Sequence, residues 1–276
     1  MALSSSYTDD LRLAHLLADK ADSITLDRFR AQDLKITTKP DLTVLSDADT
    51  TVEQTIRRTL AQARPRDAIH GEEMPDAGWG PRRWILDPID GTANFVRGVP
   101  VWATLIALMH DGVVVVGLVS APALGRRWWA CAGQGAYTGR SVLQPQPIRV
   151  SEVNQISDAF VSYSSLHGWV DAGRGRQFGN LLREAARTRA FGDFWSYVMV
   201  AEGTVDIATE PELALHDMAA LDIIVREAGG AFTSVDGNEG PSGPGALATN
   251  GLLQEAVLDL LAPDDNADDS LVIARR

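Results

Sequence analysis

One stretch, Trp84-Ile-Leu-Asp-Pro-Ile-Asp-Gly-Thr-Ala-Asn-Phe95, constrains the fold of this chain more than any other part of the sequence. Its first three residues are apolar and are typical of the end of a buried strand, and the Pro and Gly that follow predict a turn. Asp87 and Asp90 therefore leave the C-terminal edge of a strand together. Both carboxylates can point toward one position, and the carbonyl of Ile89 lies between them.

These oxygen atoms predict a metal site. Carboxylate and carbonyl oxygens are hard ligands, which suit Mg²⁺, Mn²⁺ or Ca²⁺ better than Zn²⁺. The backbone N–H groups of Gly91 and Thr92 come next in the chain and could hold a phosphate oxygen if a helix begins there. The stretch thus predicts a divalent cation next to an anion site.

Composition excludes several classes of protein. The chain has 276 residues, 45% of them hydrophobic, enough for one large domain or two smaller ones. A formal net charge of −12 argues against duplex nucleic acid as a partner. No apolar run is long enough to span a membrane, and the first residues lack the pattern of a signal peptide, so we expect a cytoplasmic protein without membrane contact. The single cysteine, Cys131, excludes an internal disulfide and is interpreted as a core residue.

Two helices are predicted in the N-terminal part. Apolar residues recur at helical spacing from residue 7 to about residue 29, which indicates a long amphipathic helix. Ser46 and Asp49 have the spacing of a capping box, which predicts a second helix from 47 to about 63. Asp47 falls in its first turn, where the helix dipole favours a negative charge.

A sheet follows these helices. The segment 65–81 is predicted as a loop, and its Glu72 is a candidate third carboxylate because the acidic turn lies just downstream. Apolar runs at 101–109 and 113–120, joined by Asp-Gly, predict a β-hairpin. Residues 128–132 extend the same antiparallel sheet.

The composition changes near residue 143, where Gln-Pro-Gln-Pro suggests a boundary between two halves, 1–142 and 143–262. The acidic, polar residues 263–276 are expected to form a disordered tail. The second half is predicted to contain a strand at 159–164, helices at 177–187 and 194–202, a strand at 204–209 before Glu210, and a helix that Asp217 caps and Gly229-Gly230 end.

Several motifs of other enzyme classes are missing from the sequence. It has no P-loop, no complete dinucleotide fingerprint, no nucleophile elbow and no histidine pair at zinc spacing. What remains is a set of acids: Glu72, Asp87, Asp90 and Asp217, with Asp47 beside them.

These blocks resemble the inositol-monophosphatase superfamily of metal-dependent, lithium-sensitive phosphatases. The resemblance rests on Gly71-Glu-Glu73, on the 84–95 stretch and on Asp217-Met-Ala-Ala220 with Gly229-Gly230, and it covers roughly residues 11–261. Within the superfamily, segments 94–102, 120–124, 127–129 and 190–193 are most similar to bacterial histidinol-phosphate phosphatases. The resemblance implies a layered αβαβα fold, with the metal site between the two halves.

The resemblance also implies roles for individual residues. Glu72, Asp87 and the Ile89 carbonyl would hold one metal ion, and Asp87, Asp90 and Asp217 a second. A third ion would rest on Glu72. Asp47 and Thr92 would orient and deprotonate the attacking water, and the amides of Gly91 and Thr92 would hold the phosphate. His216 is a departure, because the family commonly has Trp before the last metal-binding Asp.

The implied reaction is hydrolysis of L-histidinol phosphate with two or three Mg²⁺ ions, Mn²⁺ being possible, by a homodimer that lithium inhibits. Two metal ions can neutralise a phosphate dianion and activate water. The cationic end of histidinol phosphate calls for acids, and Glu210 and Asp193 are the candidates, although Asp193 could instead be a helix cap. The alternatives are an inositol monophosphatase, a broader phosphatase, and a non-catalytic metal-binding regulator. A phosphatase for phosphoadenosine compounds is less favoured, because no basic pocket for a second phosphate is evident.

Overall fold

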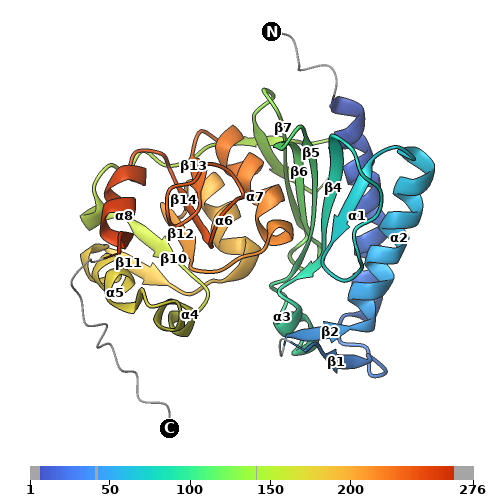
Figure 1. The fold of residues 1–276 in the computed structure, drawn as a ribbon, viewed down its shortest axis with the longest axis horizontal. Helices are drawn as coiled ribbons and strands as arrows, with labels where there is room; N and C mark the ends of the chain where they lie inside the picture. The colour runs from blue at the N-terminus through green and yellow to red at the C-terminus, as the bar shows by residue number, and fades with distance from the viewer. Residues whose placement is uncertain (1–6, 41–42, 141, 264–276) are drawn as a thin grey trace.

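The computed structural model describes residues 7–40, 43–140 and 142–263. In these ranges helices and sheets alternate in five layers, helix, sheet, helix, sheet, helix (Figure 1). The αβαβα fold predicted from the sequence is therefore confirmed. Except for Pro263, the expected disordered tail lies outside the described residues.

The larger sheet has seven strands in the described chain, ordered as they occur in the sequence. Its first pair is parallel and every other pair is antiparallel. The predicted hairpin is present, with Asp111 and Gly112 at positive φ in its turn. The strands are β3 (Ala68–Gly71), β4 (Arg82–Asp90), β5 (Ala103–His110), β6 (Val113–Ala121), β7 (Arg126–Cys131), β8 (Ala136–Gly139) and β9 (Gln146–Ile148).

The outer face of this sheet is covered by α1 (Thr8–Arg28) and α2 (Asp47–Ala63), both close to their predicted limits. The predicted capping box opens α2, since Ser46 and Asp49 make both of its reciprocal hydrogen bonds. The short strands β1 (Ile36–Thr38) and β2 (Val44–Ser46) precede this helix in the sequence and pair with each other.

The second sheet has the order β11-β10-β12-β14-β13 and is mixed. Three helices pack on its outer face around a core that includes Trp169 and Phe178. The strands are β10 (Phe160–Ser162), β11 (Arg187–Arg189), β12 (Ile207–Glu210), β13 (Ala231–Thr233) and β14 (Ala246–Thr249). The helices are α4 (Leu166–Asp171), α5 (Gly175–Glu184) and α8 (Gln254–Leu261).

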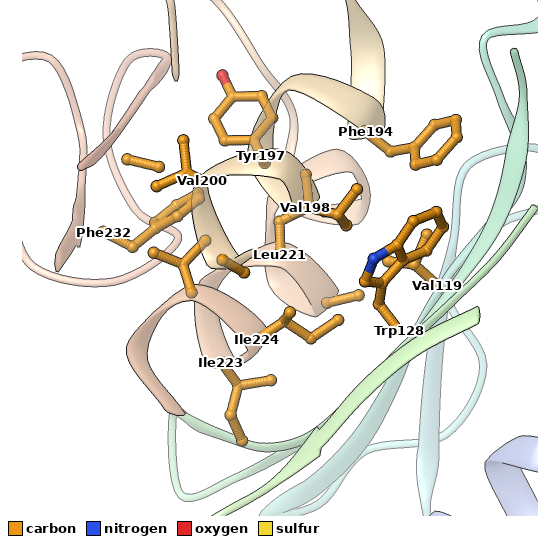
Figure 2. Packing of buried hydrophobic residues seen from close by; sticks show 14 of the residues in the cluster. Val119, Trp128, Phe194, Tyr197, Val198, Val200, Leu221, Ile223, Ile224 and Phe232 are labelled. Atoms are coloured by element: carbon orange, nitrogen blue, oxygen red, sulfur yellow. The ribbon is translucent and has the colours of Figure 1, made fainter. Parts of the chain in front are cut away.

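The middle layer consists of α6 (Asp193–Ala201) and α7 (Leu215–Glu227), which lie between the two sheets. Figure 2 shows how their apolar side chains meet Trp128 of the larger sheet on one side and Phe232 of the second sheet on the other. Because both helices are buried on two sides, they are apolar on most of their surface. They fix the position of the second sheet relative to the first.

Several predicted boundaries differ from the structure. The predicted strand 204–209 begins at Ile207 and includes Glu210. The predicted loop 65–81 contains β3, which pairs with β4 although it is only four residues long. The predicted helix 177–187 ends at Glu184, and the next residues form β11. The chain pairs once more with the larger sheet through β9, so it leaves that sheet after Ile148 and not at residue 142. For β3 and β11 strand pairing with a more distant segment overrides the local pattern, whereas β9 forms a hairpin with the nearby β8.

Candidate active site

The acidic stretch remains in the sheet longer than its sequence suggests. Strand β4 continues to Asp90, with a register shift between Asp87 and Asp90, so the turn predicted after Leu86 begins only at Gly91. Pro88 is tolerated inside the strand because the ladder is interrupted there, and its carbonyl accepts a hydrogen bond from the Thr104 hydroxyl at 2.7 Å. The irregularity turns both carboxylates toward the same end of the sheet.

The structure brings three of the predicted metal ligands together. One carboxylate oxygen from each of Asp87, Asp90 and Asp217 lies within 4.8 Å of the others. Asp217 arrives on α7, and it is the third residue of that helix, so the prediction that it is the N-cap was wrong. Its Oδ2 accepts a hydrogen bond from the backbone N–H of Ala214, the actual cap residue, at 2.8 Å. The other carboxylate oxygen of Asp217, Oδ1, takes no part in this hydrogen bond.

The electrostatics of this cluster call for a cation. Asp87 is buried, and its Oδ1 has no hydrogen-bond partner among the described residues. Burial, and then the charges of Glu72 and Asp90, raise the pKa of Asp87 well above its usual range. Burial raises the pKa of Asp90 as well, followed by repulsion from Asp193, although the Phe194 N–H donates to Asp90 Oδ2 at 2.7 Å. Buried carboxylates that repel one another suit a divalent ion with oxygen ligands.

Glu72 lies beside this cluster, directly after the last residue of the neighbouring strand β3. Its backbone N–H donates to the carbonyl of Leu86 at 3.2 Å, which places it next to Asp87. Its carboxylate is engaged by Lys39, whose Nζ lies 2.7 Å from Glu72 Oε1 and 2.8 Å from Glu73 Oε1. Lys39 was not among the residues singled out from the sequence, because its position gives no sign that it reaches an acid 33 residues away.

The two aspartates at the start of α2 have different surroundings. Asp47 is half-buried: its Oδ2 forms an ion pair with Arg28 at 2.9 Å, and its Oδ1 is buried without a hydrogen-bond partner among the described residues. Asp49 is fully buried, and its Oδ1 accepts a hydrogen bond from the Thr92 hydroxyl at 3.1 Å. The resemblance implied that Asp47 acts with Thr92 on the attacking water, but the carboxylate bonded to Thr92 is that of Asp49. The sequence had identified Asp49 as a member of the capping box. That structural role accounted for the residue, so its contact with Thr92 was not predicted.

The turn after β4 depends on a glycine. Gly91 has φ 83°, and a Cβ atom there would lie 3.0 Å from the Val101 carbonyl oxygen and 3.3 Å from Asp193 Oδ2. Any side chain would therefore be both strained and crowded. The short helix α3 (Thr92–Val96) begins immediately afterwards, and the Thr92 hydroxyl also lies 2.8 Å from the carbonyl oxygen of Ile89. The Gly91 and Thr92 amides thus follow the acidic cluster directly.

Two further acids face the cluster from the second half of the chain. Asp193 is the first residue of α6, with φ 51°, and the N-cap residue of that helix is Gly192, so the alternative that Asp193 is the cap is wrong. Asn94 Nδ2 donates to Asp193 Oδ2 at 2.9 Å, and the Asp193 N–H donates to Ser164 Oγ at 2.9 Å. Glu210 ends β12. Burial raises the pKa of Asp193 to about 6 and that of Glu210 to about 8.

His216 occupies the position before Asp217. Its Nε2 lies 3.6 Å from Asp217 Oδ1, and its ring stacks with the ring of His70 from β3, with 6.0 Å between ring centroids. His70 in turn contacts Asp76 at 2.7 Å. The two rings therefore connect α7 to β3, the strand that ends directly before Glu72.

A buried cluster of carboxylates at the end of a sheet, with a threonine and a buried aspartate beside it, is the arrangement of a hydrolase that uses divalent metal ions. Comparison with known proteins agrees with this class. The model of the inositol monophosphatase family matches residues 8–266, and the chain belongs to that family. It is a phosphatase, and the family is metal-dependent. The recognition made from the sequence is confirmed.

Individual relatives support the same placement. A histidinol-phosphatase of Streptomyces coelicolor is 60% identical over 92% of this chain and 97% of its own length. A histidinol-phosphatase of Mycobacterium tuberculosis is 55% identical over 92% and 98%, respectively. Among solved structures, the extragenic suppressor protein suhB from Bartonella henselae matches with a TM-score of 0.83 at 28% identity, over 92% of this chain and 98% of that one.

Another solved relative, an inositol monophosphatase from Zymomonas mobilis, matches with a TM-score of 0.80 at 31% identity, over 93% of this chain and 98% of that one.

In the described residues, no helix has the length and apolar character needed to cross a bilayer.

Proposed function

We propose that this phosphatase hydrolyses L-histidinol phosphate to L-histidinol. The observation that supports this substrate is the pair of acids, Asp193 and Glu210, that face the metal cluster from the second half of the chain. Histidinol carries an ammonium group and an imidazole, for which carboxylates are good acceptors, whereas inositol offers neutral hydroxyls. The high identity to the two histidinol-phosphatases points the same way.

We propose Mg²⁺ as the metal, with two or three ions bound and Mn²⁺ as a substitute. Asp87, Asp90 and Asp217 would hold the ions together with Glu72 and the carbonyl of Ile89. When bound, such ions neutralise the phosphate dianion, activate the attacking water and stabilise the leaving alkoxide. Lys39 bonds to Oε1 of Glu72, so Glu72 would hold an ion through its other carboxylate oxygen, Oε2, or would share Oε1 with Lys39.

The residues of the chain then perform the proton transfer and the positioning. The Thr92 hydroxyl lies within hydrogen-bond distance of both Asp49 and the Ile89 carbonyl, and it can donate its proton to only one of them at a time. We propose that Thr92 orients the attacking water and that Asp49 receives the proton, in place of the Asp47 expected from the sequence. The Gly91 and Thr92 amides would hold the phosphate oxygens.

The carboxylates of Asp193 and Glu210 would recognise the alcohol that leaves the phosphate. Asn94 and Ser164 hold Asp193 in a backbone conformation that is rare for residues other than glycine. We propose that Asp193 and Glu210 accept hydrogen bonds from the cationic end of the substrate, and that Asn94 and Ser164 act as positioning residues.

Steady-state kinetics with Asp193→Asn would test the substrate. This change removes the charge and keeps the shape, so kcat/KM for histidinol phosphate should fall by about tenfold or more, the usual worth of a charge-assisted hydrogen bond. The rate with inositol phosphate should change by less than about twofold. Glu212→Gln, an exposed acid near Glu210, is the matched control and should change neither. A wild-type preference for inositol phosphate would refute the proposed substrate and favour an inositol monophosphatase.

Asp90→Asn tests the metal chemistry separately from the substrate. A two-metal hydrolase should lose most of its rate with every phosphate ester, because a ligand charge is lost. We also propose inhibition by lithium and a homodimer in the cytoplasm, as the family resemblance implies. Inhibition assays and light scattering would test the first two of these.

A further inference from the structure

A cavity of about 540 Å³ lies between the turn of the β5–β6 hairpin, the C-terminal end of α7 and strand β13. It therefore touches the larger sheet, the middle layer and the second sheet. None of its lining residues belongs to the acidic site, because α7 carries Asp217 near its N-terminus and meets the cavity through Asp222 and Arg226. Its volume lies within the range found for small-molecule sites.

Arg226 brings a positioned positive charge to this cavity. Its Nε and Nη2 atoms donate to the two carboxylate oxygens of the buried Asp222, at 2.7 and 2.6 Å. This fork-shaped contact fixes the plane of the guanidinium. The Arg226 side chain is 38% exposed, and its Nη1 donates to none of the described residues. The Nη1 edge is therefore available to an anionic group of a ligand.

Glu239 brings a negative charge to the same cavity. Its backbone is held beside β13 by a β-bridge to Thr233, and the Gly240 N–H donates to the Phe232 carbonyl oxygen at 3.2 Å. The exposed carboxylate of Glu239 makes no hydrogen bond or salt bridge with any residue that the structure describes. It is therefore available to a cationic group of a ligand.

The two charges lie near each other without pairing. The hydrogen bonds to Asp222 are the main cause of the raised pKa of Arg226, and the charge of Glu239 adds to it. A purely anionic ligand would be attracted by Arg226 and repelled by Glu239, and a purely cationic one would meet the opposite. A molecule that carries both charges is attracted by both residues. The pair of charges therefore favours a zwitterion.

The remaining walls are largely apolar. Met109, Ala231 and Pro241 are half-buried, and Val113, at the hairpin turn, is 57% exposed. An apolar group of a ligand would remove this surface from water, which is favourable. An α-amino acid with an apolar side chain combines such a group with both charges in one small molecule.

We propose that this cavity binds a free α-amino acid with a large apolar side chain. Its carboxylate binds the Nη1 edge of Arg226, its ammonium group binds Glu239, and its side chain lies against Met109 and Val113. The site is separate from the phosphatase centre, and the proposal does not depend on the identity of the phosphate ester.

Saturation-transfer NMR on the full-length protein tests the proposal with three compounds of similar shape. L-Phenylalanine carries both charges, N-acetyl-L-phenylalanine lacks the ammonium group, and L-phenylalaninamide lacks the carboxylate. For a ligand of this size we expect saturable binding of L-phenylalanine with a Kd of about 5 mM or below. Each analogue should bind about threefold to tenfold more weakly, because it loses one ion pair and is repelled by the other charge.

Two variants locate the binding. Glu239→Gln should weaken binding of L-phenylalanine by about threefold or more and remove its preference over the N-acetyl compound. Val113→Trp fills the rim of the cavity and should weaken binding of all three compounds. Arg226 is left unchanged, because its loss would leave the carboxylate of Asp222 buried without a partner.

Each variant has a matched control outside the cavity. Glu184→Gln changes an exposed acid on α5, and Leu26→Trp changes an apolar residue on α1 that is 49% exposed. Neither residue lines the cavity, so the three affinities should stay unchanged. Thermal melting and the phosphatase rate check that all four variants are folded.

The proposal is overturned by any of three results. The first is the absence of saturable binding of L-phenylalanine up to its solubility limit. The second is equal affinity for the zwitterion and its two singly charged analogues. The third is binding that neither Glu239→Gln nor Val113→Trp changes, which would place the amino acid elsewhere on the protein.

Discussion

Asp47 and Asp49 show how strongly the surroundings of a residue determine its chemistry. They are two positions apart at the start of one helix, yet Asp47 faces Arg28 and Asp49 faces Thr92. Burial raises the pKa of Asp49, against the hydrogen bonds from Ser46 and Thr92 that lower it. Asp49, which is buried and bonded to Thr92, therefore has the position and the raised pKa that the proposed role of proton acceptor requires.

Replacing each aspartate by asparagine separates these roles. Asp49→Asn should lower kcat by about 100-fold or more, as expected for loss of a general base. It should also cost about 1 kcal/mol of stability, because the capping box is weakened. Asp47→Asn should leave kcat within about threefold, since loss of a partly exposed ion pair has small effects. Equal losses in the two variants would contradict the assignment.

His15 makes a prediction about acid stability. Burial, and then the charge of Arg127, lower the pKa of His15 to about 4, against a smaller opposing effect of Asp19. Between pH 6.5 and pH 4 the unfolded chain therefore binds more protons at this residue than the folded chain. The contribution of neutral His15 is complete above pH 6.5 and is lost as the pH falls toward 4.

Melting curves of wild type and His15→Phe between pH 7 and pH 5 test this linkage. The wild type should lose about 1–2 kcal/mol more than the variant on going to pH 5. Identical pH profiles would show that His15 is protonated in the folded protein without penalty.

At the scale of elements, the contact between β6 and α7 fixes the distance between the larger sheet and the middle layer. Gly117 of β6 faces α7 so closely that a Cβ atom would lie 2.4 Å from Ile223 Cγ2 and 2.7 Å from the Ala220 carbonyl oxygen. Asp217 is carried by the same helix. The absence of a side chain at Gly117 therefore helps to bring Asp217, a proposed metal ligand, to the end of β4.

Gly117→Ala should force α7 away from the sheet. Overpacking of this kind costs about 1–3 kcal/mol, and the displaced Asp217 should also weaken Mg²⁺ binding. Gly80→Ala is the matched control, because its Cβ would meet only the Arg66 carbonyl oxygen, at an ordinary 3.7 Å. Chemical denaturation and isothermal titration with Mg²⁺ provide the two measurements. Unchanged values for Gly117→Ala would disprove the close-contact argument.

At the scale of the whole molecule, the candidate site collects acids from both sheets and the helices between them. Asp87 and Asp90 come from β4, Asp217 from α7, Asp193 from α6 and Glu210 from β12. No local segment could hold this many acids together against their repulsion. Packing of the layers has to offset it until cations bind.

The metal-free protein should therefore become less stable as the pH rises. Burial, followed by the nearby Asp193 and Asp217, raises the pKa of Glu210 to about 8. A carboxyl with a raised folded pKa stabilises the fold fully below pH 4.5, and this contribution is lost as the pH rises toward 8. Melting in EDTA should show a falling Tm from pH 5 to pH 8, and Mg²⁺ should raise the Tm most at pH 8.

Glu210→Gln should flatten that profile, whereas Glu255→Gln, an exposed acid on α8, should not. A Tm in EDTA that is constant or rises from pH 5 to pH 8 would show that the acids do not repel one another in the metal-free fold.

The sequence was sufficient for the features that depend on neighbouring residues. Periodicity located α1 and α2, the Asp-Gly pair located the β5–β6 hairpin, and the 84–95 stretch supplied hard oxygen ligands and the family resemblance. Each of these is decided within a few residues, by helical spacing, turn geometry or ligand chemistry.

Only the tertiary structure decided which acids meet. It extended β4 to Asp90, because pairing with β5 outweighs the local turn signal, and it moved Asp217 from the cap into the first turn of α7. It placed Asp49, and not Asp47, within hydrogen-bond distance of Thr92, and it placed Lys39 on Glu72. These contacts join residues far apart in the chain, and the packing of distant layers, which leaves no periodic trace in the sequence, determines them.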